Sequence, residues 1–529
     1  MIGKSLQDLS PFARELAAES MAWMDGFWDE EAGLLAIGED KTTAKRKTRN
    51  TARYAIGLLL RNAAGDDERA CKAIDAVLRH QHDEPGSPLH GAFRSWAGQS
   101  HPGPNPTIFQ FDPNHRQFNG TLFALLLDEY AARLPSDLVE RIDLALRRMV
   151  DGEPPERCLP VYSNIALMQA GLLTWAGNRY ARPDWVHRGE VLGSEIHQLF
   201  AEVNAFEEYN SPTYYGTDLF ALAFWRRHSR SESLARLGAE IEASIWRDSA
   251  PFYHADLRNM SGPYTRSYGM DMKAYCALFG MYIWLGVGRQ DAPFPPATSG
   301  FFGHCEDFCW GPCMSIVDTD IPAEVLPRFT EFSGERFIER RISVKPDRVA
   351  TAWIAGTIMI GAEATPLDAG ELTFYRLRED FEEFNPASHH WRDPDFAAQR
   401  CALLSRDFCP ATIHWRMPNG GTGWLRLQHL GAIRARASER RLEIAGHIEP
   451  KLATRYGEAH TSFVFRICVS GAPVSMEPDV WRLPGLTIRP VGNLGRPVIH
   501  AEGEEVTVTY TLETPWPEIQ FEVSQDASG

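Results

Sequence analysis

The first 290 residues carry apolar side chains at helical spacing, and the rest of the chain alternates as strands do. Residues 138–149 and 233–245 have apolar positions three or four apart, which predicts amphipathic helices with one buried face. Other segments are apolar on every side and predict helices buried all round: residues 58–60, 122–127, 165–175, 219–225 and 272–285. The two kinds alternate, so we expect inner apolar helices surrounded by outer amphipathic ones.

Polar and aromatic residues gather just before the apolar helices. Markers of these segments recur at intervals of roughly 50 residues, which fits one helical hairpin per repeat; the markers are Asn119, Asn164, Tyr214 and Tyr268. This repetition predicts a closed (α/α) toroid over residues 1–290. The loops at the amino-terminal ends of the inner helices then form its mouth, where unpaired N–H groups favour anions.

Strand patterns dominate after a proline-rich linker at residues 291–300. They occur at residues 340–344, 350–360, 412–417, 423–427, 441–448, 461–469 and 506–512, and a turn at residues 419–421 separates two of them. This pattern predicts large antiparallel sheets packed face to face in residues 301–529. The fold class is therefore α+β and multidomain, with an N-terminal (α/α) toroid followed by a C-terminal antiparallel β-sandwich.

The richest polar segment is residues 206–219, which read FEEYNSPTYYGTDL. Its hydrogen-bonding aromatics and carboxylates are typical of a binding-site wall, although the same residues could simply lock a loop. Tyr214 and Tyr215 lie about 100° apart on the predicted helix, so we expect one of them to face the mouth. Glu208 and Asn210 precede the helix and are expected to bind substrate with them.

Three further segments supply candidate catalytic or substrate-binding residues. They are His115 and Asn119 in residues 112–120, Asn164 in residues 162–164, and Tyr264, Arg266 and Tyr268 in residues 264–271. Helix capping is the alternative for the Asn residues, and a structural Arg–Asp pair is the alternative for Arg266. A guanidinium beside a phenol would lower the pKa of the phenol. A polar loop at residues 385–393, with His389 and His390, is either a lid over the mouth or an exposed connection.

Composition narrows the possible partners. A net charge of −16 argues against nucleic acid. The sequence has no apolar run of about 18 residues, so we expect no membrane span. The N-terminal residues lack the apolar centre of a signal peptide and nine cysteines show no framework spacing, so we expect a cytoplasmic protein with reduced thiols. Aromatic residues make up 11% of the chain, which suits sugar stacking and a large core equally.

Residues 304–313 hold metal-ligand types at four-residue spacing: His304, Cys305, Cys309 and Cys313. The C-x-x-C hairpin of structural zinc sites is missing, so buried thiols in a strand or turn are the preferred interpretation, and whether they bind a metal stays open. We expect no cofactor. Glycine-rich phosphate loops, G-x-S-x-G and H-E-x-x-H are also missing, which disfavours nucleotide enzymes, α/β-hydrolases and zincins.

The predicted architecture resembles the polysaccharide lyases of the heparinase II/III, alginate and hyaluronate lyase group. Those families place an Asn, often followed by His, on one toroid loop and a Tyr in a pattern like E-x-S-x-x-Y on the next. Residues 162–164 match the first, with Ile165 in place of the His. Residues 208–214 match the second with one extra residue.

The resemblance implies β-elimination on a uronate-containing oligosaccharide or polysaccharide. Its implied roles are charge neutralisation by Asn164, Asn210 and Arg266, proton removal by Tyr214 or a histidine, and protonation of the leaving oxygen by a tyrosine. His389, His390 or His115 would replace the missing histidine.

Two other functions remain open on the same architecture. An inverting glycoside hydrolase would use two carboxylates about 6.5–9.5 Å apart, drawn from Glu207, Glu208, Asp218 and Asp271. A non-catalytic glycan-binding protein would use the same aromatic loops without turnover. The sequence leaves the sugar, the linkage, endo or exo action and the oligomeric state open.

Overall fold

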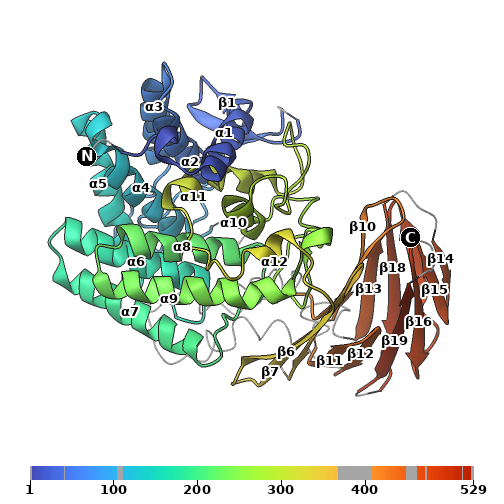
Figure 1. The fold of residues 1–529 in the computed structure, drawn as a ribbon. Coiled ribbons are helices and arrows are strands. Elements are labelled where there is room, and N and C mark those ends of the chain that lie inside the picture. The colour runs from blue at the N-terminus through green and yellow to red at the C-terminus, as the bar shows by residue number, and fades with distance from the viewer. Residues whose placement is uncertain are drawn as a thin grey trace.

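A computed structural model describes residues 3–40, 42–103, 111–155, 157–366, 408–429, 431–447, 461–470, 474–514 and 516–525. Helices occupy most of the first 330 residues, and a large antiparallel sheet follows and lies beside them (Figure 1). The predicted order of a helical toroid followed by a β-sandwich is confirmed.

Five helices form the inner wall of the toroid and are buried on nearly every side: α2 (Thr48–Arg61), α4 (His115–Tyr130), α6 (Ser163–Arg179), α8 (Tyr214–His228) and α10 (Leu278–Val287). Each packs on the next, from α2 to α10. The ring is closed by α1 (Pro11–Asp25) and α11 (Gly311–Val317), which both pack on α10 and on α2.

Outer helices cover the inner ones, one for each hairpin. They are α3 (Asp66–Leu78), α5 (Ser136–Asp151), α7 (Pro183–Ala201) and α9 (Glu232–Ser249), which pack on α2, α4, α6 and α8 respectively. Gly216 shows how closely the inner helices approach, because a Cβ there would lie 2.4 Å from Leu278 Cβ of α10. A short sheet of β1 (Trp28–Asp29), β2 (Leu34–Ile37) and β3 (Lys45–Lys47) precedes α2.

The helical part extends further than the sequence indicates. After residue 290 come a 3-10 helix (Cys305–Trp310), α11 and α12 (Pro327–Thr330), and strands begin only at β6 (Arg336–Ser343). The cysteines of this segment are therefore helical, not in a strand, because their four-residue spacing matches one helical turn. The helix expected from residue 272 starts at Leu278, so Tyr268 lies in a loop. That loop follows the hairpin of β4 (Tyr253–His254) and β5 (Asn259–Met260).

The large sheet is antiparallel throughout and continuous. Its described strands are β6, β7 (Arg348–Ala355), β8 (Ile358–Thr365), β9 (Ala411–Arg416), β10 (Thr422–Gln428), β11 (Ile433–Ser438), β12 (Arg441–Gly446), β13 (Ser462–Cys468), β14 (Ser475–Glu477), β15 (Val480–Leu483), β16 (Leu486–Gly492), β17 (Val498–Glu502), β18 (Glu505–Thr511) and β19 (Glu518–Gln525). The segment predicted as one strand at residues 350–360 is a hairpin of β7 and β8.

This sheet folds over on itself to enclose a core. Phe465 of β13 and Phe521 of β19 lie 4.9 Å apart between ring centroids, although their strands are not neighbours in the sheet. Trp481 of β15 joins the same cluster. The two arms of the sheet therefore pack face to face, as a sandwich requires.

The helical ring and the sheet are joined by hydrogen bonds around residues 261–270. Tyr264 exchanges backbone hydrogen bonds with Cys409, and a ring nitrogen of His414 lies 3.0 Å from the carbonyl oxygen of Met270. The buried guanidinium of Arg348 on β7 donates to Glu207 and Thr265 of the helical part, at 2.8 Å each. These contacts fix the loop that carries Arg266 and Tyr268.

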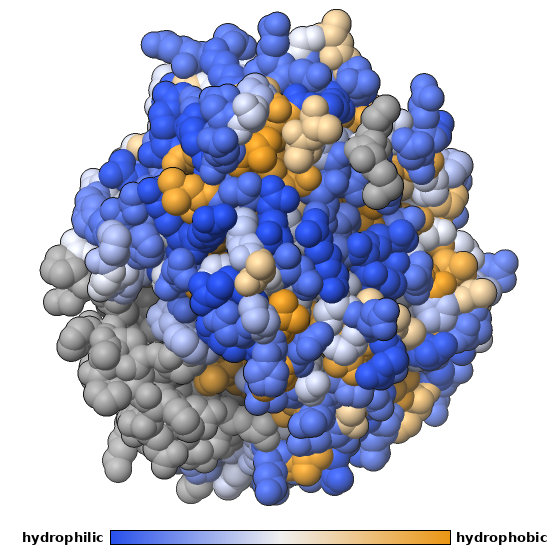
Figure 2. Space-filling model, turned by 90° about the vertical axis from the view of Figure 1, so that its left-hand side faces the viewer, coloured by the Kyte–Doolittle hydropathy of each residue, from blue (hydrophilic) through white to orange (hydrophobic). Residues whose placement is uncertain are grey.

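None of the helices in the described ranges combines the length and the hydropathy needed to cross a membrane. On the face drawn in Figure 2, hydrophilic side chains predominate and hydrophobic ones gather in small groups.

Candidate active site

The carboxylate of Glu208 lies where the starts of two inner helices meet, and it is 1% exposed. Arg266 Nη1 donates to Oε1 at 2.8 Å, and the side-chain amide of Asn164 donates to Oε2. The Ser163 hydroxyl lies 3.4 Å from the same oxygen. One carboxylate thus connects the first turn of α6, the loop before α8 and the loop after β5.

Arg266 leads from this carboxylate to two partly exposed phenols. Its guanidinium lies 3.8 Å from the ring centroid of Tyr214, and its Nη2 is 3.5 Å from the hydroxyl of Tyr268. The two hydroxyls share a hydrogen bond of 2.5 Å. We call Asn164, Glu208, Tyr214, Arg266 and Tyr268 the Glu208 cluster.

His304 extends the cluster toward solvent. Its exposed imidazole stacks on Tyr268, with ring centroids 4.7 Å apart and planes 15° from parallel. Its backbone φ is 50°, in the left-handed region that residues other than glycine seldom adopt. The sequence pointed to His304 only as a metal-ligand type, and its place beside Tyr268 depends on tertiary packing.

The expectation that Arg266 lowers the pKa of the phenol is wrong in its net direction. Burial raises the pKa of Tyr214 well above its ordinary value, and Arg266 offsets only part of this rise. Tyr214 is therefore protonated at neutral pH, which suits a proton donor better than a base.

Three of the predicted binding residues have structural roles instead. The Asn210 amide donates to the carbonyls of Ser261 and Pro263, at 2.8 and 3.0 Å, and its φ is 52°. Tyr215 is 2% exposed and packs on Phe279. Tyr264 is buried and donates its hydroxyl to a backbone carbonyl. These contacts are structural, and for Asn210 and Tyr215 this is the alternative that the sequence left open for residues 206–219.

Two candidates on α4 are buried in the ring. His115 is 4% exposed, with Nε2 at 3.3 Å from the Ser95 hydroxyl, and burial lowers its pKa to about 4. Asn119 is fully buried, and neither atom of its amide has a hydrogen-bond partner among the described residues. His389 and His390 lie outside the described residues, so the lid hypothesis is not tested.

Two arginines on α2 were missed as site residues. Arg53 is fully buried, its guanidinium lies 3.7 Å from the ring centroid of Trp310, and burial lowers its pKa to about 9. Arg49, one turn earlier, lies over Phe118 at 4.4 Å. Within the described ranges, Arg49 and Arg53 form no ion pair and their side chains donate no hydrogen bond. Residues 49–54 do open an apolar helix, as the chosen segments do, so this signal was present in the sequence.

Arg49 and Arg53 lie at the same end of the ring as the Glu208 cluster. Asp307 is close enough to His304 and to both arginines for their charges to affect its pKa, which burial raises. Hydrogen bonds also join neighbouring helix starts, for example from Asn114 to Tyr162 at 2.9 Å. The guanidiniums and the tyrosine pair therefore belong to one end of the toroid.

The carboxylates that a hydrolase would need are already engaged or buried. Glu207 pairs with Arg348 at 2.8 Å, and Glu208 pairs with Arg266. Asp218 is fully buried, and burial together with the nearby charge of Glu208 raises its pKa well above the ordinary value. Asp271 lies toward the sheet beside Lys273, and burial raises its pKa as well.

The cysteine segment shows no metal geometry in the described part of the chain, where no three ligand atoms of residues 304–313 converge. Burial raises the pKa values of Cys309 and Cys313 to about 12 each. The thiolates that a metal needs are therefore disfavoured there.

A family described as "Domain of unknown function (DUF8769)" matches residues 14–319, more than half of the chain. The chain belongs to this family. The match runs from α1 to just beyond α11, so it covers the closed helical ring. No curated protein matches the chain.

Three solved structures are similar over nearly the whole chain. A heparinase III matches with a TM-score of 0.49 and 10% identity, covering 99% of this chain and 87% of its own. A Streptomyces coelicolor A3 chondroitin AC lyase in complex with chondroitin sulphate has 0.43 and 10%, covering 98% and 80%. A heparinase III with methylated lysines has 0.32 and 9%, covering 100% and 87%. No score reaches 0.5, so the fold assignment rests on the elements described above.

Proposed function

We infer that this chain cleaves a uronate-containing oligosaccharide or polysaccharide by β-elimination at the Glu208 cluster. One observation carries the proposal: Asn164 and Arg266 share a buried carboxylate, and that arginine stacks on one member of a hydrogen-bonded tyrosine pair. An amide, a cation and two phenols are the groups that abstraction of a proton beside a carboxylate requires.

In this proposal, Arg266 and Asn164 neutralise the negative charge that develops on the substrate carboxylate. The proton on C5 of a uronate becomes acidic when the neighbouring carboxylate is held by hydrogen-bond donors, because negative charge develops there in the transition state. Arg266 donates to Glu208 through Nη1 and Asn164 donates through its side-chain amide, so the shared carboxylate fixes both donors in place. Glu208 is a positioning residue in this account.

In this proposal, His304 and the hydroxyls of Tyr214 and Tyr268 transfer the protons. The imidazole of His304 is exposed and stacks on Tyr268, so its ring can serve as the base that accepts the C5 proton. The C5–H electron pair forms the C4–C5 double bond, the C4–O4 bond breaks, and the tyrosine pair protonates the leaving oxygen. The high pKa of Tyr214 supports this acid role. His304 thereby takes the part of the histidine that is missing after Asn164.

The arginines of α2 favour an acidic substrate over a neutral one. The partly exposed guanidinium of Arg49 has no ion pair among the described residues and lies at the same end of the ring as the tyrosine pair, so it suits a carboxylate or sulfate group on a neighbouring sugar. The buried cation of Arg53 lies one turn further along α2. The engaged carboxylates also count against an inverting hydrolase, which needs two of them facing the scissile bond.

A glycan panel tests the proposal. The intact chain is incubated with polyuronates and with neutral polysaccharides, and both ultraviolet absorbance and new reducing ends are followed. We expect absorbance from the unsaturated product on a polyuronate and none on neutral glycans. New reducing ends without absorbance would indicate hydrolysis, and binding without either signal would indicate a glycan-binding protein.

The same assay tests the arginines. Arg49→Gln should raise KM about tenfold or more, because a charge-assisted hydrogen bond contributes about 1.5–3 kcal/mol, with a much smaller change in kcat. Arg236→Gln, an exposed arginine on α9, is the matched control. Equal KM values for the two variants would remove Arg49 from substrate binding.

A further inference from the structure

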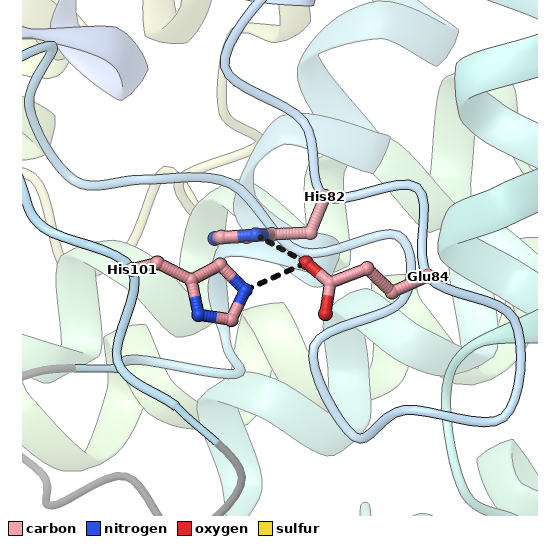
Figure 3. A group of neighbouring side chains, drawn as sticks. All are labelled: His82, Glu84 and His101. Atoms are coloured by element: carbon pink, nitrogen blue, oxygen red, sulfur yellow. Dashed lines mark hydrogen bonds and ion pairs between the residues drawn. The ribbon is translucent and has the colours of Figure 1, made fainter.

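Two histidines and a glutamate converge on the loop between α3 and α4, outside the Glu208 cluster. His82 Nδ1 lies 3.1 Å from Glu84 Oε1, and His101 Nε2 lies 2.9 Å from the same oxygen. The two rings are nearly perpendicular, and their nitrogens and the carboxylate point toward one another (Figure 3). In the described residues, this is the one group of three such side chains whose ligand atoms all lie within 4.8 Å of one another.

We propose that His82, Glu84 and His101 bind a divalent transition-metal ion of the Zn²⁺ type. Two imidazoles and one carboxylate form a borderline-soft ligand set that suits zinc and leaves a fourth position for water. Tetrahedral bonds of about 2.0–2.2 Å place neighbouring ligand atoms roughly 3.3 Å apart. The two N···O distances to Glu84 are close to that value, and the two imidazole nitrogens lie within 4.8 Å of each other, so metal binding needs them to approach by at most about 1.5 Å.

The surroundings suit an accessible metal site. The side chain of His82 is 6% exposed, whereas those of Glu84 and His101 are 36% and 47% exposed, so an ion can enter from solvent. The backbone holds His82 firmly, because its N–H donates to Ala92 and its carbonyl accepts from Gly91. The backbone N–H of Glu84 donates to His90 at 3.2 Å, which orients the carboxylate segment.

One bond must change when the metal binds. His101 Nδ1 accepts the backbone N–H of Gly103 at 3.1 Å, so the proton of the neutral ring is on Nε2. Metal binding through Nε2 moves this proton to Nδ1, and the bond from Gly103 is lost. The backbone near residue 103 therefore shifts on metal binding.

A metal here would act as a clamp on a loop that reaches the end of the toroid with the Glu208 cluster. It would tie His101 to His82, nineteen positions earlier in the sequence. The segment between them includes Ser95, whose hydroxyl contacts His115 and whose carbonyl accepts from Thr48 at the start of α2. The clamp therefore steadies the neighbourhood of Arg49 without taking part in chemistry, and it does not depend on the proposed elimination.

The test is zinc binding by the intact chain after chelator treatment and dialysis. Calorimetry with ZnCl₂ should give one equivalent and a rise in Tm that EDTA reverses, and Co²⁺ should give the visible spectrum of a tetrahedral N/O site. His101→Ala and Glu84→Gln should each weaken zinc binding at least tenfold, because even partners beyond the ligands cost 10–100-fold. Circular dichroism checks that these variants fold.

His187→Ala, an exposed histidine on α7, is the matched control and should bind zinc as the unaltered chain does. Failure of the unaltered chain to bind one equivalent would overturn the proposal. So would zinc affinity that His101→Ala leaves unchanged, or that His187→Ala lowers as much.

Discussion

Two buried carboxylates lie at the same end of the helical ring, and they have different surroundings. Glu153 is enclosed by Arg116, Arg157 and Gln117, and Arg157 continues to Asn114 at 2.7 Å. These four partners are all buried. Glu208 has one arginine and one amide, and its network ends in partly exposed phenols.

This difference in surroundings distinguishes a carboxylate that stabilises the fold from one that, in our proposal, positions catalytic groups. Both networks satisfy a buried charge with arginine, which a folded chain must do wherever a carboxylate is buried. Of the two, only the Glu208 cluster continues to groups that are partly exposed to solvent. A buried arginine–glutamate pair therefore does not by itself indicate an active site. Its role depends on whether the residues connected to it by hydrogen bonds and stacking are buried or exposed.

Removing a phenol should have the largest effect. Tyr214→Phe deletes the hydroxyl that bonds to Tyr268 and should lower kcat/KM on a polyuronate about 10²–10⁴-fold, the usual contribution of a proton-transfer group. The free energy of unfolding should change by only about 1 kcal/mol, because a single hydrogen bond is lost. Steady-state kinetics and chemical denaturation measure the two quantities, and retained turnover would remove Tyr214 from the mechanism.

Glu153→Gln should have the opposite effect, a large loss of stability with little change in activity. It leaves Arg116 and Arg157 buried without their counter-charge, which should lower the free energy of unfolding by about 3–5 kcal/mol. The catalytic constants of the folded fraction should stay close to those of the unaltered chain. Glu195→Gln, an exposed glutamate on α7, is the control in chemical denaturation. Equal losses for the two variants would contradict the structural role of Glu153.

Acid should destabilise the ring through His115. Its pKa is about 4 in the folded chain and about 6.5 when unfolded. Between these values the unfolded chain binds a proton that the folded chain does not, so stability present above pH 6.5 falls as the pH drops toward 4, by at most about 3 kcal/mol.

Chemical denaturation at several pH values between about 4 and 6.5 measures how steeply the free energy of unfolding depends on pH. His115→Asn should reduce the slope without abolishing it, because burial also lowers the pKa values of His254 and His414 to about 4. An unchanged slope would mean that His115 takes up its proton without cost in the folded chain.

Glu208→Gln should lower activity less than Tyr214→Phe does and should cost more stability. Arg266 and Asn164 donate to different oxygens of Glu208, so the single amide oxygen can accept from only one of them and the amide NH₂ faces the other donor. The lost charge-assisted hydrogen bond should cost roughly 1.5–3 kcal/mol of stability. Misplacing Arg266 should lower kcat/KM by about 10–100-fold. A variant with full activity would show that Glu208 belongs with Glu153, as a purely structural carboxylate.

The helices and most members of the candidate site could be predicted from local pattern. Apolar periodicity distinguishes inner from outer helices, because a helix buried all round is apolar on every side and a helix buried on one side is apolar on one face only. Asn164, Glu208, Tyr214, Arg266 and Tyr268 were all chosen from polar segments, and the fold brings them together.

The roles within those segments were harder to predict. Asn210 and Tyr264 have the same chemistry as Asn164 and Tyr268 but point to backbone carbonyls, and only tertiary contacts decide this. Among the described residues Arg49 and Arg53 have no ion partner, and sequence pattern does not reveal this. Helices were expected to end at the proline-rich segment because it looks like a domain linker, whereas α11 beyond it completes the ring.

The mass of the product formed from a polyuronate tests the central claim most directly. Elimination at the Glu208 cluster predicts fragments whose new non-reducing ends are unsaturated and one water lighter than hydrolysis products. Glu208→Gln should form the same fragments more slowly. Fragments that carry the added water, formed by the unaltered chain, would contradict the account.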